Sequence, residues 1–162
     1  MSRIIFSNSD GTLSFIVPCL NEINPATGQP FTIQEIADKD IPAGISTYSI
    51  VEDSVIPTDI SFRNAWVGVG IGTTGGVISE DITKAKEIHK TNIRKARIPK
   101  LAELDVEFQK ALETSADTSA IIAKKQALRD APADSAIDAA TDEAGLKRQW
   151  NTSILGTSPY TS

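Results

Sequence analysis

The chain has 162 residues, carries a formal net charge of −5 and contains 6% aromatic residues. This length suits one domain or two very small ones, and the net acidity argues against a dedicated nucleic-acid binder. No apolar run approaches the roughly 18 residues that a membrane span needs, and the N-terminus enters a strand-like pattern without the apolar core of a signal peptide. We therefore expect a soluble protein made in the cytoplasm.

The charges are unevenly distributed along the chain. Residues 1–81 hold three basic and ten acidic side chains, residues 83–100 hold seven basic and one acidic, and residues 101–162 hold six basic and ten acidic. A basic block between two acidic segments can neutralise itself within the chain or between subunits. The block lacks interleaved aromatic residues on which nucleic-acid bases would stack. We interpret it as a solvated or intersubunit face.

The first segment of the chain has the pattern of a β-hairpin. Two β-rich runs, at residues 3–7 and 12–17, are separated by a turn that contains Asp10-Gly11. Asp-Gly between such runs is a strong hairpin signal because both residues tolerate positive φ. Pro18 then ends the second strand because it cannot donate to a ladder.

A short helix and further β-structure follow the hairpin. Thr32-Ile33-Gln34-Glu35 has the spacing of a capping box, which predicts a helix over residues 33–39. A strand is expected over residues 48–51, and residues 61–69 fit a strand or a short helical turn. Residues 1–67 are therefore predicted to form a small α+β docking unit.

A glycine-rich stretch comes next, since five of the ten glycines lie between Gly68 and Gly76. Glycine loses more conformational freedom on folding than any other residue, so we predict a flexible linker over residues 68–79. Gly70 to Gly75 also match the dinucleotide-binding pattern G-x-G-x-x-G. That function requires a helix that opens at once and an acidic residue about twenty positions later, where Lys95 stands instead.

A helical domain is predicted over residues 80–155, and a long helix dominates it. Apolar residues recur at helical spacing from Ile82 to Leu112, which indicates one long helix or two helices bent at Pro99. Proline removes a backbone donor and clashes with the preceding turn, so a kink or break is expected near Ile98. Beyond it the apolar residues step by 3, 4 and 4 and form a stripe suited to one partner helix: Leu101, Leu104, Phe108 and Leu112.

The rest of the chain is expected to contain shorter helices. One is predicted over residues 119–129, an alanine-rich helix capped by Asp134 follows, and residues 146–155 form a last turn or two. Residues 156–162 are a Ser/Thr-rich tail that we expect to be loose. Residues 115–145 contain only four large aliphatic side chains, and such a thin core favours stability gained from a partner or from self-association. The predicted fold class is α+β, with a hairpin-containing unit, a linker and a helical hairpin or bundle.

No combination of side chains predicts a reaction, a cofactor or a bound metal. Cys19 is the single cysteine, which excludes an internal disulfide, and we interpret it as a small buried hydrophobe. His89 is the single histidine and is interpreted as a solvated or interface residue. One histidine and one cysteine cannot supply an ordinary zinc site within one chain. Adjacent carboxylates are interpreted as turn residues or helix caps: Asp38/Asp40, Glu52/Asp53 and Glu80/Asp81.

Four stretches of the chain form a recognisable set of packing and turn motifs. They are Arg3-Ile4-Ile5-Phe6 with the Asp10-Gly11 turn; Ile56-Pro57-Thr58-Asp59 leading to Phe62-Arg63-Asn64-Ala65-Trp66; Arg94-Lys95-Ala96-Arg97-Ile98-Pro99-Lys100-Leu101-Ala102-Glu103-Leu104-Asp105; and Lys124-Lys125-Gln126-Ala127-Leu128-Arg129-Asp130 with Leu146-Lys147-Arg148-Gln149-Trp150. Together they resemble a group of small proteins of tailed bacteriophages and prophages, encoded among tail and tail-fibre genes. Some members are virion structural proteins and some are tail-assembly chaperone-like proteins.

The resemblance implies a non-enzymatic virion component at the tail or the tail-fibre attachment. Its expected partners are other phage structural proteins (tail, fibre or connector) and copies of itself, with neither a membrane nor nucleic acid involved. The alternatives are an assembly chaperone absent from the mature particle, a capsid decoration protein and an enzyme such as a nucleotide-binding protein. No catalytic or ligand residue carries over from the group.

The candidate interface residues are apolar and aromatic side chains with two charged neighbours. Tryptophan is enriched at interface hot spots and also anchors small cores, so both roles stay open for the two tryptophans. The candidates are Trp66, Leu101, Leu104, Phe108 and Trp150, with Arg94 and Arg97 as charged partners.

Overall fold

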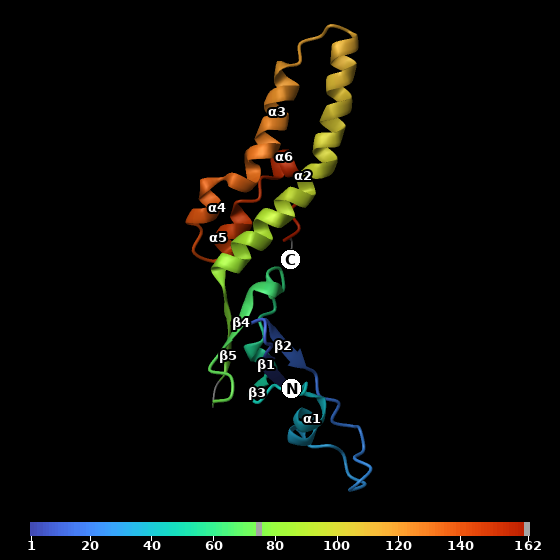
Figure 1. Cartoon of the computed structure of the whole chain (residues 1–162), viewed down its shortest axis with the longest axis vertical. Helices are drawn as coiled ribbons and strands as arrows, with labels where there is room; N and C mark the ends of the chain where they lie inside the picture. The colour runs from blue at the N-terminus through green and yellow to red at the C-terminus, as the bar shows by residue number, and fades with distance from the viewer. Residues whose placement is uncertain (74–75, 161–162) are drawn as a thin grey trace. The chain divides into compact units, whose positions relative to one another are not determined.

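The computed structural model describes residues 1–73 and 76–160, and the chain folds into two compact units, Met1–Asp81 and Ile82–Ser162. The first unit contains small antiparallel sheets, and the second is helical (Figure 1). The predicted α+β fold class is confirmed.

The main sheet of the first unit has three antiparallel strands in the order β2-β1-β3. The central strand β1 (Ser2–Ser7) pairs with β2 (Leu13–Ile16) and with β3 (Tyr48–Glu52). The predicted hairpin is confirmed: Gly11 has a φ of 78°, and the Asp10 carboxylate accepts hydrogen bonds from the Thr12 amide and hydroxyl. These contacts close the turn and fix the register of β1 against β2.

Two different layers cover the two faces of this sheet. On one face, Ile36 and Ala37 of helix α1 (Ile33–Asp40) pack against Ile4. The predicted capping box starts α1, since the Thr32 side chain accepts from the Glu35 amide and the Glu35 carboxylate accepts from the Thr32 amide. Phe15 pairs with Ile5 and therefore lies on the face opposite Ile4. There the Arg63 guanidinium lies 4.5 Å from the centroid of the Phe15 ring, and the neighbouring Phe62 is fully buried. Two short 3₁₀ turns, η1 (Asp53–Val55) and η2 (Arg63–Ala65), follow β3 along the chain.

Most of the segment predicted as a flexible linker, residues 68–79, forms a second hairpin instead. Strand β4 (Trp66–Val69) pairs antiparallel with β5 (Val77–Glu80), and both belong to the first unit. The glycines permit close approach: a Cβ at Gly76 would lie 2.6 Å from the Ser49 hydroxyl oxygen. Thr74 and Gly75, which complete the predicted linker and the G-x-G-x-x-G match, lie outside the described residues.

The second unit is built on one long helix, α2 (Ile82–Glu113). It continues through Pro99, so of the predicted kink or break the structure shows the kink, and Figure 1 shows the helix axis changing direction about halfway along. Pro99 and Lys95 are both exposed. The Lys95 carbonyl, which loses its helical donor to the proline, therefore lies where water can bind it, and the helix bends rather than ends.

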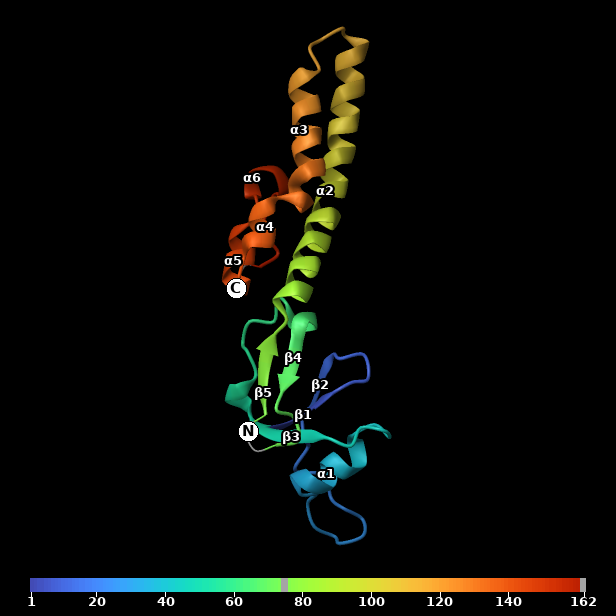
Figure 2. The same cartoon turned by 60° about the vertical axis from the view of Figure 1, so that its left-hand side comes forward.

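The remaining helices fold back along α2. Helix α3 (Ser119–Asp130) runs beside its C-terminal half, and α4 (Ser135–Ala139), α5 (Glu143–Arg148) and α6 (Thr152–Leu155) follow after the 3₁₀ turn η3 (Ala131–Ala133) (Figure 2). Asp134 caps α4 as predicted, because its carboxylate accepts from the Ala136 amide. The tail expected to be loose is packed as far as Tyr160, which is only 8% exposed, and its last two residues, 161–162, lie outside the described residues.

The second unit divides into two regions that we name by their packing. The bundle comprises residues 82–104 and 128–160, and it contains all of the buried side chains of the unit. The arm comprises residues 105–127, in which no residue is buried. The arm is thus a helical hairpin held by contacts along one seam only.

Candidate functional site

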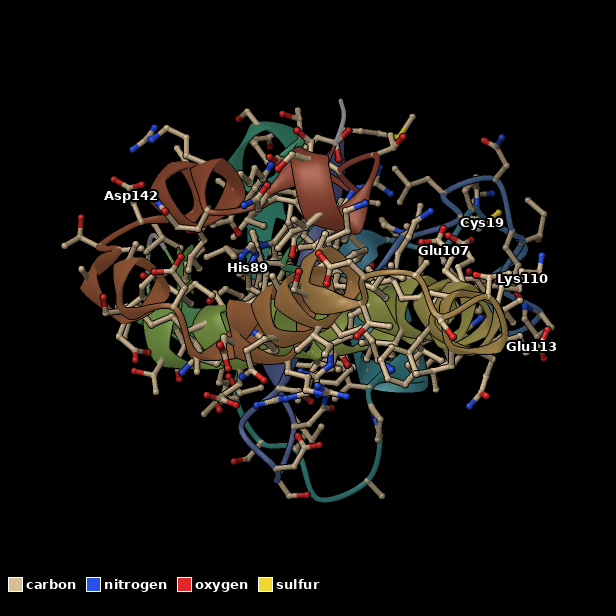
Figure 3. The ribbon with its side chains drawn as sticks, turned by 90° about the horizontal axis from the view of Figure 1, so that it is seen from above. Cys19, His89, Glu107, Lys110, Glu113 and Asp142 are labelled. Carbon is tan, nitrogen blue, oxygen red and sulfur yellow. The ribbon has the colours of Figure 1, made fainter. Side chains whose placement is uncertain are left out.

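The bundle encloses a group of aromatic side chains around His89. Residues from α2, from the α5–α6 connection and from the C-terminal segment meet here: His89, Trp150 and Tyr160 are all buried. The His89 and Tyr160 rings are stacked with centroids 5.5 Å apart, and Trp150 meets both rings edge-on. Figure 3 shows His89 lying inside the helical unit.

Hydrogen bonds join two side chains of this group to each other and to Asn92. Asn92 Nδ2 donates to Tyr160 Oη over 3.2 Å, and His89 Nδ1 lies 2.9 Å from the same oxygen. A hydroxyl can accept from Asn92 and still either donate to His89 Nδ1 or accept from it, so the donor in this contact depends on the imidazole tautomer. In either tautomer the contact ties the C-terminal segment to α2.

Burial sets the pKa values in this group. It lowers the pKa of His89 to about 4 and raises the pKa of Tyr160, so both side chains are neutral near pH 7. The expectation of a solvated or interface histidine is wrong. Ala85, His89 and Ile93 are spaced four residues apart and share the buried side of α2, a pattern that the sequence contains but that the neighbouring lysines obscure.

The basic residues of α2 are partly used inside the unit. The Lys90 ammonium lies 2.8 Å from the Asp138 carboxylate, and Lys86 donates to the Asp138 carbonyl over 2.7 Å. The hydrogen bond from Lys90 is the largest cause of a lowered pKa at Asp138, and the bond to Asp138 raises the pKa of Lys90. Arg97 donates to the Arg129 carbonyl over 2.8 Å and so satisfies the C-terminal end of α3. Of the two ways in which the basic block can be neutralised, the structure shows the one within the chain for Lys90, whereas Lys86 and Arg97 bind backbone carbonyls.

The predicted interface residues mostly face inward. Trp66 is 2% exposed, Trp150 is 7% exposed and Leu104 is 8% exposed, so each is a core residue of its own unit. Leu101 and Phe108 are half-buried, Arg97 binds α3, and Arg94 is exposed. Of the two roles left open for the tryptophans, the structure shows the core role. As contacts to a partner, all seven residues stay predictions.

Large apolar side chains lie on the outside of both units. In the first unit they include Val17, Leu20 and Ile23 of the loop after β2, which are about half exposed or more, as well as Ile60 and Val69 elsewhere. Cys19 is exposed in the same loop, so the expectation of a buried cysteine is wrong. Backbone hydrogen bonds close the loop, among them Asn24 N–H to the Gln29 carbonyl over 2.8 Å and Phe31 N–H to the Glu22 carbonyl over 2.9 Å. In the second unit they lie along α2 and α3: Ile98, Val106, Leu112 and Ile122.

The described residues offer limited means of holding a ligand. In residues 1–73 and 76–160, no three His, Cys, Asp or Glu side chains are grouped closely enough to hold a metal ion. A surface pocket of about 260 Å³ lies between α2, α3 and α6, where Leu104, Leu128 and Ile154 lie beside charged residues including Lys124. No helix in the described part of the chain combines the length and apolar character that a membrane crossing requires.

Comparison with known proteins gives no relative for this chain. No protein-family model, no curated protein and no solved structure matches it. The bacteriophage group named from its motifs therefore stays a prediction from the sequence.

Proposed function

We propose that this chain is a non-enzymatic structural component of a tailed-bacteriophage particle, located at the tail or at a tail-fibre attachment, and that it acts through protein–protein contacts. The proposal rests on the sequence resemblance and on one structural observation. The arm carries large exposed apolar side chains and has no buried residue between 105 and 127. Covering such side chains with a partner removes apolar surface from water, so an arm with little burial of its own is suited to a protein–protein contact.

The two units have different tasks in this proposal. The first unit docks onto a neighbouring structural protein, and its exposed loop with Val17, Leu20 and Ile23 is the candidate contact. The helical unit associates with copies of itself or with a fibre through the outer surfaces of α2 and α3. After synthesis in the host cytoplasm, the protein would then be located in the virion.

The second candidate is a tail or tail-fibre assembly chaperone that leaves before the particle matures. The arm favours it to the extent that an exposed helical hairpin can hold an unassembled partner. Mass spectrometry of purified particles separates the two functions. We expect the chain at a stoichiometric level, and its absence from mature particles would favour the chaperone. Image reconstruction of the virion would then distinguish a tail position from a capsid decoration position.

A variant of the arm tests the contact surface directly. Val106→Asp with Ile122→Asp changes two side chains that are 54% and 50% exposed, so the helical content and melting temperature should be retained. We expect particles to incorporate this variant poorly. Leu104→Asp is unsuitable for this purpose because Leu104 is buried, and its charge would destabilise the base of the arm.

The enzymatic alternative makes a different prediction. A nucleotide or metal that binds the folded chain raises its melting temperature by mass action. We expect an unchanged melting temperature across a panel of nucleotides and divalent cations. A reproducible, concentration-dependent increase for one of them would contradict the proposal.

A further inference from the structure

We propose that the outward face of α2 pairs, in antiparallel orientation, with the same face of a second copy of this chain. The face is defined by six residues that we call the outer stripe, and every one of them is exposed: Lys95, Ile98, Ala102, Val106, Gln109 and Glu113. This inference rests on the proposed function and deepens it, because it names the partner of the helical unit as the chain itself.

The outer stripe follows from helical geometry. Its residues step by 3, 4, 4, 3 and 4, which matches the 3.6 residues of a helical turn, so they share one side of α2 across the bend near Pro99. They lie on the other side of the helix from Arg97, which binds α3, and from buried Leu104. The stripe spans about 27 Å, at 1.5 Å per residue.

The charges of α2 are divided between its two halves. Residues 82–99 hold six basic and one acidic side chain, whereas residues 103–113 hold four acidic and one basic. Some of these charges are paired within the unit, as Lys90 is with Asp138 and Asp105 is with Lys125. Exposed Arg94 in the first half and exposed Glu107 in the second have no ion-pair partner within the described residues. Each half therefore presents unpaired charge that is mostly of one sign.

An antiparallel second copy brings the unpaired basic charges of one helix beside the unpaired acidic charges of the other. The twofold axis then lies level with residue 104, so Lys95 of each copy faces Glu113 of the other, and Ala102 faces Val106 of the other. Neither Lys95 nor Glu113 has an ion-pair partner within the described residues. Figure 3 shows Glu113 extending from the outside of the unit. The small Ala102 side chain allows the two helices to approach closely.

A different protein is a poorer match to the same stripe. A uniformly acidic partner surface would attract the basic half of α2 and be repelled by the acidic half, and a basic surface would do the reverse. The two charged ends of the stripe are complementary to each other after a twofold rotation, and self-complementarity of this kind is the condition for a symmetric dimer. Its apolar part is short, so a single pair is weak and is strengthened where many copies are held close together.

Charge reversal at the two ends of the stripe tests the pairing. Sedimentation of the full chain over a concentration series, under reducing conditions because Cys19 is exposed, should reveal a dimer. Lys95→Glu and Glu113→Lys each create like-charge contacts at both ends, and each should weaken the dimer about tenfold. An equimolar mixture of the two variants should restore it, because each variant then faces its opposite.

Two controls separate pairing from folding and from general charge effects. Glu113→Lys puts a cation at a helix C-terminus, which favours the folded helix, so unfolding cannot explain a weaker dimer. Lys124→Glu makes the same charge change as Lys95→Glu on α3, away from the stripe, and should leave the dimer unchanged. A monomeric parent chain, single variants that dimerise like the parent, or a mixture that fails to restore dimers would each overturn the inference. If one of these results is obtained but the chain is still present in purified particles, the pairing is refuted and the proposed function is retained.

Discussion

The bundle and the arm of the second unit share α2 but differ in how their side chains are held. In the bundle, side chains far apart in sequence pack against one another. His89, for example, contacts Trp150 and Tyr160, which lie 61 and 71 positions later in the chain. In the arm, α2 and α3 meet along one seam, where the Lys125 ammonium lies 2.5 Å from the Asp105 carboxylate. One region is held by burial and the other by half-exposed contacts.

This difference teaches where stability and association reside in the unit. Burial of apolar side chains is the main source of folding free energy, so the bundle should determine the stability of the unit. The arm contributes little burial of its own, and its exposed apolar side chains gain stability only when another surface covers them. Substitutions of the same kind should therefore have different effects in the two regions.

The largest effect is expected for a leucine in the bundle. Leu146→Ala removes a fully buried side chain and leaves a cavity, so the free energy of unfolding should fall by about 3–5 kcal/mol. Leu112→Ala is the matched control in the arm, since Leu112 is 52% exposed, and should change it by less than about 0.5 kcal/mol. Urea unfolding followed by far-ultraviolet circular dichroism measures both. Equal losses for the two variants would refute the distinction between bundle and arm.

As the pH falls, protonation of His89 should lower the free energy of unfolding of the bundle at a higher pH than protonation of the carboxylates does. The pKa of His89 is about 4 in the folded chain, against an ordinary value of about 6.5 in the unfolded chain. The unfolded chain therefore binds the proton first, and stability is complete above about pH 6.5 and falls as the pH approaches 4. The shift corresponds to a loss of about 3 kcal/mol.

The chain contains a single histidine, so the loss between pH 6.5 and 4.5 can be assigned to it. His89→Gln keeps a side chain that can form a hydrogen bond with the Tyr160 hydroxyl, and it should remove the slope in that window. The lowered pKa values of Asp138 and Asp117 act at lower pH, because these groups lose their stabilising charge only on protonation. A free energy of unfolding that stays constant from pH 6.5 to 4.5 in the parent chain would contradict the burial of His89.

A smaller effect is expected when only the hydroxyl of the aromatic group is removed. Tyr160→Phe retains the ring that stacks on His89 but deletes the oxygen that Asn92 and His89 contact. The free energy of unfolding should fall by about 1–2 kcal/mol, the usual result of removing one partner from a buried hydrogen bond. The same urea titration measures it. A loss as large as that of Leu146→Ala would mean that the C-terminal segment detaches altogether.

Turns and helix caps could be predicted from the sequence because each depends on residues only a few positions apart. The Asp10-Gly11 turn, the Thr32–Glu35 capping box and the Asp134 cap act within a few residues, and each is found where it was expected. The α+β class follows from the same signals, because they separate a β-rich first half from a helical second half.

The errors concern features that distant residues determine. The glycines of the second hairpin are packed against a strand more than twenty residues away, as Gly76 is against Ser49. His89 is buried because Tyr160, 71 positions later in the chain, folds back over it. Nothing in the sequence around either residue indicates this contact. Leu101, Leu104 and Phe108 are interface candidates because of their apolar spacing, which identifies a buried face of a helix as readily as a contact surface. Exposed side chains such as Val106 had to be located in three dimensions.

The smallest effect should come from the charged contact that closes the arm. The Lys125 ammonium contacts the Asp105 carboxylate and also lies 5.0 Å from the centroid of the Phe108 ring. Half-exposed ion pairs and cation–π contacts contribute little each, so Lys125→Ala should cost the arm about 0.5–1 kcal/mol and leave the bundle unchanged. Amide hydrogen exchange resolves the two regions: amides of residues 105–127 should exchange faster, while those near His89 keep their rates. Lys124→Ala, which has no such contact within the described residues, is the adjacent control. Faster exchange in the bundle as well would show that the arm supports the bundle, which reverses the dependence that the burial pattern indicates.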